Sequence, residues 1–285
     1  MIFNNNLAAI HAYLCADGYV IKNPETQKHK YYYIGLRNTS QVLLEDFQQK
    51  FEEQFGLKPI ITNEGRCKIQ NKSIYYSLTK EFSYYSKNWQ MPELSNEQLK
   101  YWLRAYFDCE SWVFLEHRKN RHIGLDSINL SGIKHIQDSL KRFGIESKMK
   151  EVKHRNIYRL LIYGKENLIK FQKEINFLHP QKNEKLKRVI NNYVDYNWNF
   201  PINNNDELRA LISDKARIGK NRIRFNSITK NNLNELSKIL LNNFKIESKI
   251  YDPWVNGLGN KYYQLIIHKK EQIDKFKEIF TKTHF

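Results

Sequence analysis

Residues 103–112 read LRAYFDCESW, and residues 10–19 read IHAYLCADGY. Both stretches have apolar residues at the first, fourth and fifth places and an alanine, Ala12 or Ala105, at the third. The eighth place is an acid in both, Asp17 in one and Glu110 in the other. The apolar pattern predicts two largely buried helices. Their small residues permit close helix–helix approach, and each helix ends in a carboxylate.

A carboxylate at the C-terminal end of a helix is opposed by the helix macrodipole. It calls for a compensating cation, and a metal ion is the natural candidate. The shared register singles out Glu110, whereas Asp108 is expected at the helix interface or its cap. The alternative is that Asp17 belongs to an Asp-Gly turn and Glu110 is a solvated strand end.

The chain also repeats itself on a larger scale. Residues 122–149 (HIGLDSINLSGIKHIQDSLKRFGIESKM) match residues 222–250 (RIRFNSITKNNLNELSKILLNNFKIESKI), and residues 31–60 hold a fainter copy. An internal repeat of this kind indicates repeated structural units. Three units follow, at 1–90, 93–200 and 203–285, joined by polar, proline-containing segments.

Each unit is predicted to run helix, strand, strand, helix, strand, strand, helix, which gives an α+β fold. In the second unit, Ser95 is the expected N-cap of the first helix. Segments 111–117 and 122–128 alternate as a hairpin, and Gly144 follows the next helix. A last helix is expected to end before Pro180. Each four-stranded antiparallel sheet would have helices on one face and basic or polar residues on the other.

The paired stretches resemble the LAGLIDADG motifs of homing endonucleases of the two-motif, single-chain type. The resemblance implies motif helices packed at a pseudo-two-fold axis beneath two saddle-shaped sheets. It also implies that Asp17 and Glu110 bind catalytic divalent metal. Cys15 replaces an acid of the motif that is structural in the family, and Ser111 replaces its final glycine. The second departure affects the turn from helix to strand.

The implied chemistry is hydrolysis of a phosphodiester on each DNA strand. Two carboxylates can hold Mg²⁺ (or Mn²⁺), because that ion prefers hard oxygen ligands. Such ions activate water and stabilise the leaving oxygen. A basic residue assists each site in the family, and by register the candidates are Lys87 and Lys182. The alternative for each is an ordinary surface lysine.

The sheets would read the DNA, because antiparallel β-ribbons fit the major groove. Strand alternation lets only about half of the polar positions face the groove. The DNA-binding candidates are Tyr32, Arg37, Lys68, Gln70, Lys72, Arg118, Arg121, His122, Lys148, Lys150 and Arg159.

The third unit repeats the motif without its acid. Residues 208–215 read LRALISDK, so Lys215 stands where Glu110 stands in the second unit. A cation there cannot ligate metal and would repel it. Arg222 and Arg224 favour an added nucleic-acid contact. The alternative is that this unit only packs against the rest of the chain.

Composition agrees with a nucleic-acid partner. The net charge of +17 favours a polyanion. Three scattered cysteines fit a reducing compartment. No run of apolar residues is long enough for a membrane span, and the N-terminus lacks the features of a signal peptide. We expect a protein that is not secreted, in the cytoplasm and nucleoid or an organellar matrix. The histidines have no zinc-ligand spacing, and no nucleotide-binding loop is present.

The leading hypothesis is a monomeric, Mg²⁺-dependent, sequence-specific endonuclease of double-stranded DNA, of the intron-homing kind. The residues at the two ends of the sequence favour a free-standing protein over an intein. A second hypothesis is a binding protein: an RNA maturase that acts on intron RNA, or a catalytically retired DNA-binding regulator. A nicking enzyme is a third, because the two acids differ.

Overall fold

The computed structural model describes residues 2–115, 121–193, 196, 198, 205–255 and 261–281. The chain forms two compact units, residues 1–193 and 194–285. The first two sequence repeats share the first unit and one hydrophobic core. The third repeat forms the second unit around a core of its own. Trp198 is buried in that second core, so this unit begins before residue 203.

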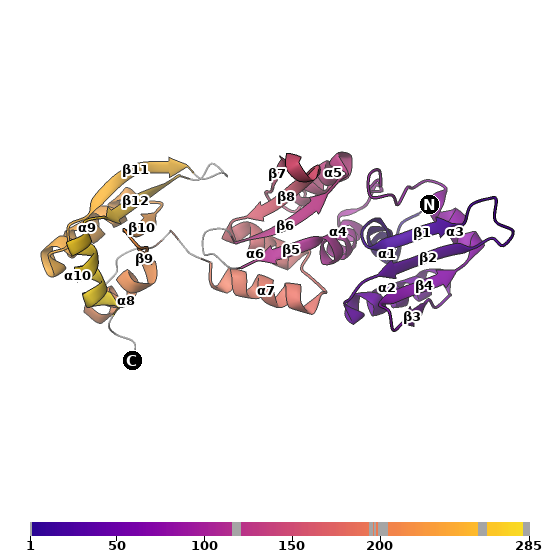
Figure 1. The fold of residues 1–285 in the computed structure, drawn as a ribbon, viewed down its shortest axis with the longest axis horizontal. Helices are drawn as coiled ribbons and strands as arrows, with labels where there is room; N and C mark the ends of the chain where they lie inside the picture. Colours follow the sequence, from indigo (N-terminus) through magenta and orange to yellow (C-terminus); the bar gives the residue numbers. More distant parts are fainter. Residues whose placement is uncertain are drawn as a thin grey trace. The chain divides into compact units, whose positions relative to one another are not determined.

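The first repeat has the predicted element order (Figure 1). Its antiparallel sheet has the strand order β1-β2-β4-β3. The elements are α1 (Asn5–Cys15), β1 (Gly18–Lys22), β2 (Tyr32–Arg37), α2 (Gln41–Phe55), β3 (Ile60–Thr62), β4 (Arg66–Gln70) and α3 (Lys72–Thr79).

The second repeat follows the same order and then adds a helix. Ser95 caps its first helix in a capping box with Gln98, and Gly144 adopts a left-handed conformation. The antiparallel sheet has the order β5-β6-β8-β7. The elements are α4 (Asn96–Glu110), β5 (Ser111–Phe114), β6 (His122–Ser127), α5 (Leu130–Lys141), β7 (Lys148–Val152), β8 (Ile157–Tyr163), α6 (Lys165–Glu174) and α7 (Pro180–Asn191).

The helix expected before Pro180 is present as α6, but the prediction that it is the last helix of the repeat was wrong. Helix α6 already ends at Glu174, and Pro180 begins α7 instead of following the end of a helix. Proline is well suited to the first turn of a helix, because its fixed φ is helical and its missing N–H has no partner there. Helix α7 matters because it carries Lys182.

The third repeat keeps the order but shortens its first strand. Its sheet has the order β11-β12-β10-β9. The elements are α8 (Asn205–Lys215), β9 (Arg217–Ile218), β10 (Ile223–Ser227), α9 (Lys230–Phe244), β11 (Lys249–Val255), β12 (Lys261–Ile267) and α10 (Lys270–Phe280).

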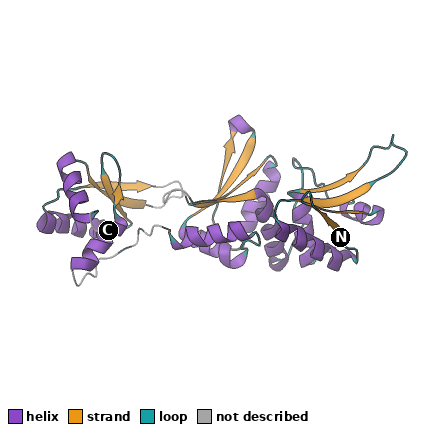
Figure 2. Cartoon of the chain, turned by 60° about the horizontal axis from the view of Figure 1, so that its bottom comes forward, coloured by secondary structure: helices purple, strands orange, loops and turns teal. Residues whose placement is uncertain are grey.

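Each sheet has one face covered by helices and one that they leave open, called here the open face (Figure 2). The alternation of buried residues identifies the faces. In β2, Ile34 and Leu36 are fully buried, so Tyr33 and Arg37 lie on the open face. In β6, Ile123 and Leu125 are buried in the same way.

Helices α1 and α4 form the centre of the first unit, side by side (Figure 1). Their packing against each other is the most extensive between any two described elements. Ala12 and Ala105 are buried, as their small size predicted. Between the helices, the Trp102 indole N–H donates to Nδ1 of His11 at 3.1 Å.

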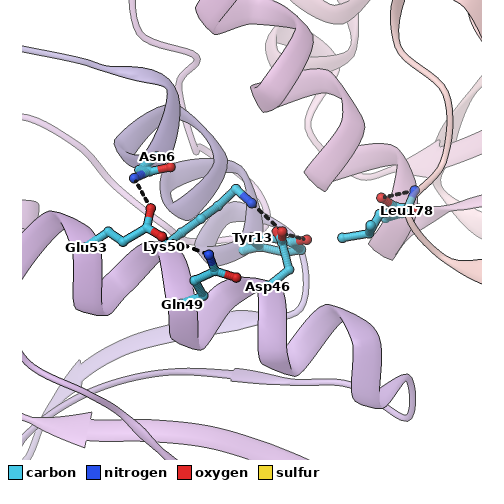
Figure 3. Close-up of polar contacts among 8 residues, drawn as sticks. Asn6, Tyr13, Asp46, Gln49, Lys50, Glu53 and Leu178 are labelled. Carbon is cyan, nitrogen blue, oxygen red and sulfur yellow. Dashed lines mark hydrogen bonds and ion pairs between the residues drawn. The ribbon is translucent and has the colours of Figure 1, made fainter.

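Helix α2 packs its apolar side into the core and also contacts α1 through polar side chains (Figure 3). The Tyr13 hydroxyl donates to a carboxylate oxygen of Asp46 at 2.9 Å. The Asn6 amide donates to Glu53 at 2.8 Å. These contacts fix the helix whose end carries Asp17.

Candidate active site

Asp17 lies two residues after the end of α1, and both its carboxylate and its backbone carbonyl accept hydrogen bonds. Its carboxylate accepts from the Asn38 side-chain amide at 2.7 Å. The Asn38 side-chain oxygen accepts from the Ser40 N–H at 2.8 Å, and this contact orients the amide toward Asp17. The Asp17 carbonyl accepts from the N–H of Arg37 at 3.1 Å. The sequence gave no signal for Asn38, because its role depends on the packing of α1 against the end of β2.

Glu110 is the last residue of α4, and its carboxyl is half-buried. Burial, followed by the negative charge of Asp17, raises its pKa from 4.5 to about 7, and Lys182 acts in the opposite direction. Asp17 and Glu110, named here the acid pair, are therefore close enough for the charge of Asp17 to oppose the ionisation of Glu110.

Lys182 neutralises the C-terminal end of α4. Its ammonium group donates to the carbonyls of Phe107 at 3.2 Å, Asp108 at 2.5 Å and Cys109 at 3.4 Å. A cation at this end of a helix compensates the macrodipole. Burial lowers the pKa of Lys182, while Asp108, Cys109 and the acid pair raise it. The cation that α4 requires is thus supplied in part by the protein itself.

Asp108 was expected at the helix interface or its cap, but the sequence did not indicate its partners in the segment before α7. It is buried, and its two oxygens accept from the N–H of Leu178 at 3.0 Å and of His179 at 2.9 Å. Burial raises its pKa to about 6, against those hydrogen bonds and Lys182. It joins α4 to the segment before α7 and so positions Lys182.

An open cavity of about 750 Å³ lies beside these groups. Its wall includes Asp17, Cys109 and Lys182 from the ends of the helices, and Arg37 from the end of β2. The Cys109 thiol is hydrogen-bonded to Asp17, and burial raises its pKa. The cavity therefore combines a carboxylate with cations in one place.

Lys87 is not among the residues that line this cavity. It is exposed in the turn that precedes Trp89. Its catalytic role stays a prediction, whereas Lys182 lies beside the acid pair.

The DNA-binding candidates are divided between the two faces of the sheets. Tyr32 is in phase with buried Ile34 and rests on Tyr75, so it lies on the helix-covered face. Lys72 begins α3 and is not on a strand, and Arg121 is buried. Arg118 lies outside the described residues. Open-face positions, by strand alternation, are held by Arg37, Lys68, Gln70, His122, Lys148, Lys150, Arg159 and Arg224.

Arg159 is held by a carboxylate on its own sheet. Its guanidinium donates two hydrogen bonds to Asp126, at 2.6 and 2.7 Å, and lies 5.0 Å from the centre of the Trp112 ring. The side chain is therefore fixed before any ligand arrives.

The corresponding end of α8 holds no acid pair. Lys215 forms an ion pair with Asp214 at 2.9 Å. Helix α8 buries Leu208 and Ile212 in the core of its own unit.

Comparison with known proteins follows this threefold pattern. The model of the LAGLIDADG-like domain matches residues 4–85, 97–176 and 212–281. The glutamine–fructose-6-phosphate aminotransferase (isomerizing) of Methanocaldococcus jannaschii is 28% identical over 210 residues, 68% of this chain and 18% of that protein. The replication factor C small subunit of Thermococcus kodakarensis is 34% identical over 131 residues, 45% of this chain and 14% of that protein. The chain spans less than a fifth of each.

Solved structures are similar at lower identity. Variants of the homing endonuclease I-DmoI align with a TM-score of 0.48 and 16% identity, over 65% of this chain and 99% of that chain. Full-length DUF199/WhiA from Thermatoga maritima aligns with a TM-score of 0.44 and 14% identity, over 74% of this chain and 67% of that chain. Because the family model matches most of the sequence in three segments, the chain belongs to the LAGLIDADG-like domain family and carries the domain three times.

Proposed function

We propose that the protein is a divalent-metal-dependent, sequence-specific endonuclease of double-stranded DNA. The observation that carries the proposal is the acid pair: Asp17 and Glu110 stand at the ends of two packed helices, and the charge of Asp17 raises the pKa of Glu110. Asp17 and Lys182 line an open cavity, whereas Glu110 is not among its lining residues. The two curated relatives do not contribute to this proposal, because an aminotransferase and a replication factor have no named activity in common.

The acid pair fits Mg²⁺ or Mn²⁺ in charge and in donor atoms. Among the described residues no group of three or more His, Cys, Asp and Glu side chains could hold a metal. Two carboxylates therefore complete a site only with water and substrate phosphate, an arrangement common for Mg²⁺. When bound, such an ion supplies an activated water and stabilises the leaving oxygen.

The remaining roles fall to the chain's own groups. Asn38 orients the Asp17 carboxylate. Lys182 of α7 is hydrogen-bonded to the C-terminal end of α4, where it places a positive charge beside the scissile phosphate and the acid pair. Arg37, at the edge of the cavity, binds backbone phosphate. Cations on the open faces of the first two sheets position the duplex.

The experiment is cleavage of a randomised duplex library with Mg²⁺, followed by sequencing of the cut ends. Wild type is compared with Asp17→Asn and Glu110→Gln. The matched control is Asp214→Asn, which removes an acid at the end of the third motif helix. We expect one recurrent cut sequence for wild type and the control, and none for the other two variants.

A second candidate is a binding protein, either a maturase of intron RNA or a retired DNA-binding regulator. The observation that favours it is Lys215, because one of the three repeats has a cation in place of the acid. Tight binding by wild type without any cutting would select this candidate.

A further inference from the structure

One position on the open face differs between the first two sheets and the third. In the first sheet Tyr19 lies opposite Gly35, and in the second Trp112 lies opposite Gly124. The rings cover the glycines so closely that a Cβ on Gly124 would come within 2.2 Å of the Trp112 ring. The pair is thus an aromatic ring packed on a glycine.

The third sheet has two arginines at this position. Arg217 of β9 lies directly opposite Arg224 of β10. Like charges in facing positions of a sheet oppose each other. The Tyr196 hydroxyl accepts from Arg217, and its ring lies 5.1 Å from that guanidinium. The pKa of Arg224 is lowered by burial and by the charges of Arg222 and Arg217.

Within the described part of the chain, Arg217, Arg222 and Arg224 form no ion pair like the one between Arg159 and Asp126. The facing pair at the corresponding place in the third sheet is Asn226 and Gln264. On the four strands of this sheet, all within the described residues, Asp252 of β11 is the single acid. The surface therefore has arginines that are oriented and close together but lack an anion.

The neighbouring rings indicate which kind of nucleic acid suits this surface. Tyr196 stacks on Tyr262, with ring centres 5.5 Å apart, and Tyr262 is only 9% exposed. Their faces are not available to unpaired bases, whose binding requires free rings. Trp254 and Tyr251, 58% and 39% exposed, are exceptions, but both lie on β11, at the opposite edge of the sheet from Arg217 of β9. Guanidinium groups without free rings suit backbone phosphates of a duplex.

We propose that the open face of the third sheet is a non-catalytic binding site for the phosphate backbone of double-stranded DNA, centred on Arg217, Arg222 and Arg224. This inference rests on the proposed function for its partner, but it needs neither the acid pair nor metal. The third repeat then adds a DNA contact to a protein whose acids lie in the other two repeats.

The test uses the full chain, a duplex of about 40 base pairs and no divalent metal, so cleavage plays no part. The probe is fluorescently labelled, and affinity is measured over a range of salt. The variants are Arg217→Gln with Arg224→Gln, and Arg222→Gln alone. The matched control is Lys230→Gln with Lys238→Gln, two exposed lysines of α9, which packs on the opposite face of the same sheet.

Each lost phosphate contact reduces the slope of log K against log salt by about 0.9. We expect a reduction of about 2 for the double arginine variant, about 1 for Arg222→Gln, and none for the lysine control. Arg222 is exposed, so its variant stays informative if the double variant unfolds. Equal slopes for arginine and lysine variants would overturn the proposal. Tighter, arginine-dependent binding of a single strand would overturn the assignment to a duplex. Absence of cleavage in the library experiment leaves this result unchanged.

Discussion

Glu110 has a raised pKa because its carboxyl is buried and lies near the charge of Asp17. A raised pKa in the folded state means that the protein holds this proton more tightly than the unfolded chain does. The associated stability is complete below about pH 4.5 and is lost as pH rises through about 7. Each pKa unit corresponds to about 1.4 kcal/mol.

Glu110→Gln removes this loss. Without divalent metal, we expect the free energy of unfolding of Glu110→Gln, relative to wild type, to rise by about 2 to 3 kcal/mol between pH 5 and pH 8. Urea unfolding of both proteins in the presence of a chelator measures the difference. A constant difference across this range would show that Glu110 titrates normally.

The contribution of His11 to stability is expected to change with pH in the opposite direction to that of Glu110. It is buried between α1 and α4, and burial lowers its pKa from 6.5 to about 3. The folded protein holds His11 neutral, so its contribution to stability is complete above about pH 6.5 and is lost as pH falls toward 3. Gln in place of His11 can still accept from Trp102 but does not titrate. We expect His11→Gln to unfold at lower pH than wild type, and identical acid midpoints would contradict this role.

At the scale of elements, the α1–α4 pair determines whether the two acids meet. Its tight packing depends on small residues, and Ala105 is 2% exposed. Ala105→Leu adds three heavy atoms there, and overpacking typically costs about 1–3 kcal/mol. The matched control is Ala210→Leu at the same motif position of α8, where the alanine is exposed. Thermal unfolding measures the stability of both variants, and we expect only Ala105→Leu to be destabilised. Equal destabilisation of the two would show that motif register does not determine the packing.

The motif helices could be predicted because their apolar residues and acids recur in register. The strands followed from alternation, and Ser95 and Gly144 from capping chemistry. Helix α7 was missed because its proline was interpreted as the residue after a helix, although the same residue suits a first turn. The roles of Asn38, Asp108 and His11 could not be predicted, since each depends on a partner distant in the sequence.

At the scale of the whole molecule, two separate hydrophobic cores predict two unfolding transitions. Leu140 is fully buried in the first core, and Leu240 in the second. Each Leu→Ala substitution removes buried methyl groups and costs about 2–5 kcal/mol. We expect Leu140→Ala to lower one calorimetric transition and Leu240→Ala the other. A single transition that both variants lower equally would contradict the division into two units.

Family membership and the threefold repeat follow from the family model. No helix among the described residues has both the length and the apolar character that crossing a membrane requires. The third repeat keeps the domain's element order but has Lys215 at the acid position and arginines on its open face. We therefore expect catalysis in the first unit and DNA binding in both.

The central claim is that Asp17 and Glu110 act together in metal-dependent cleavage. The most direct measurement is the single-turnover cutting rate on the selected duplex with Mg²⁺, resolved for each strand, alongside binding in Ca²⁺. The account predicts that Asp17→Asn and Glu110→Gln each lower the rate by about 100-fold or more with binding retained, while Asp214→Asn changes neither. Cutting by both acid variants at the wild-type rate would contradict the account.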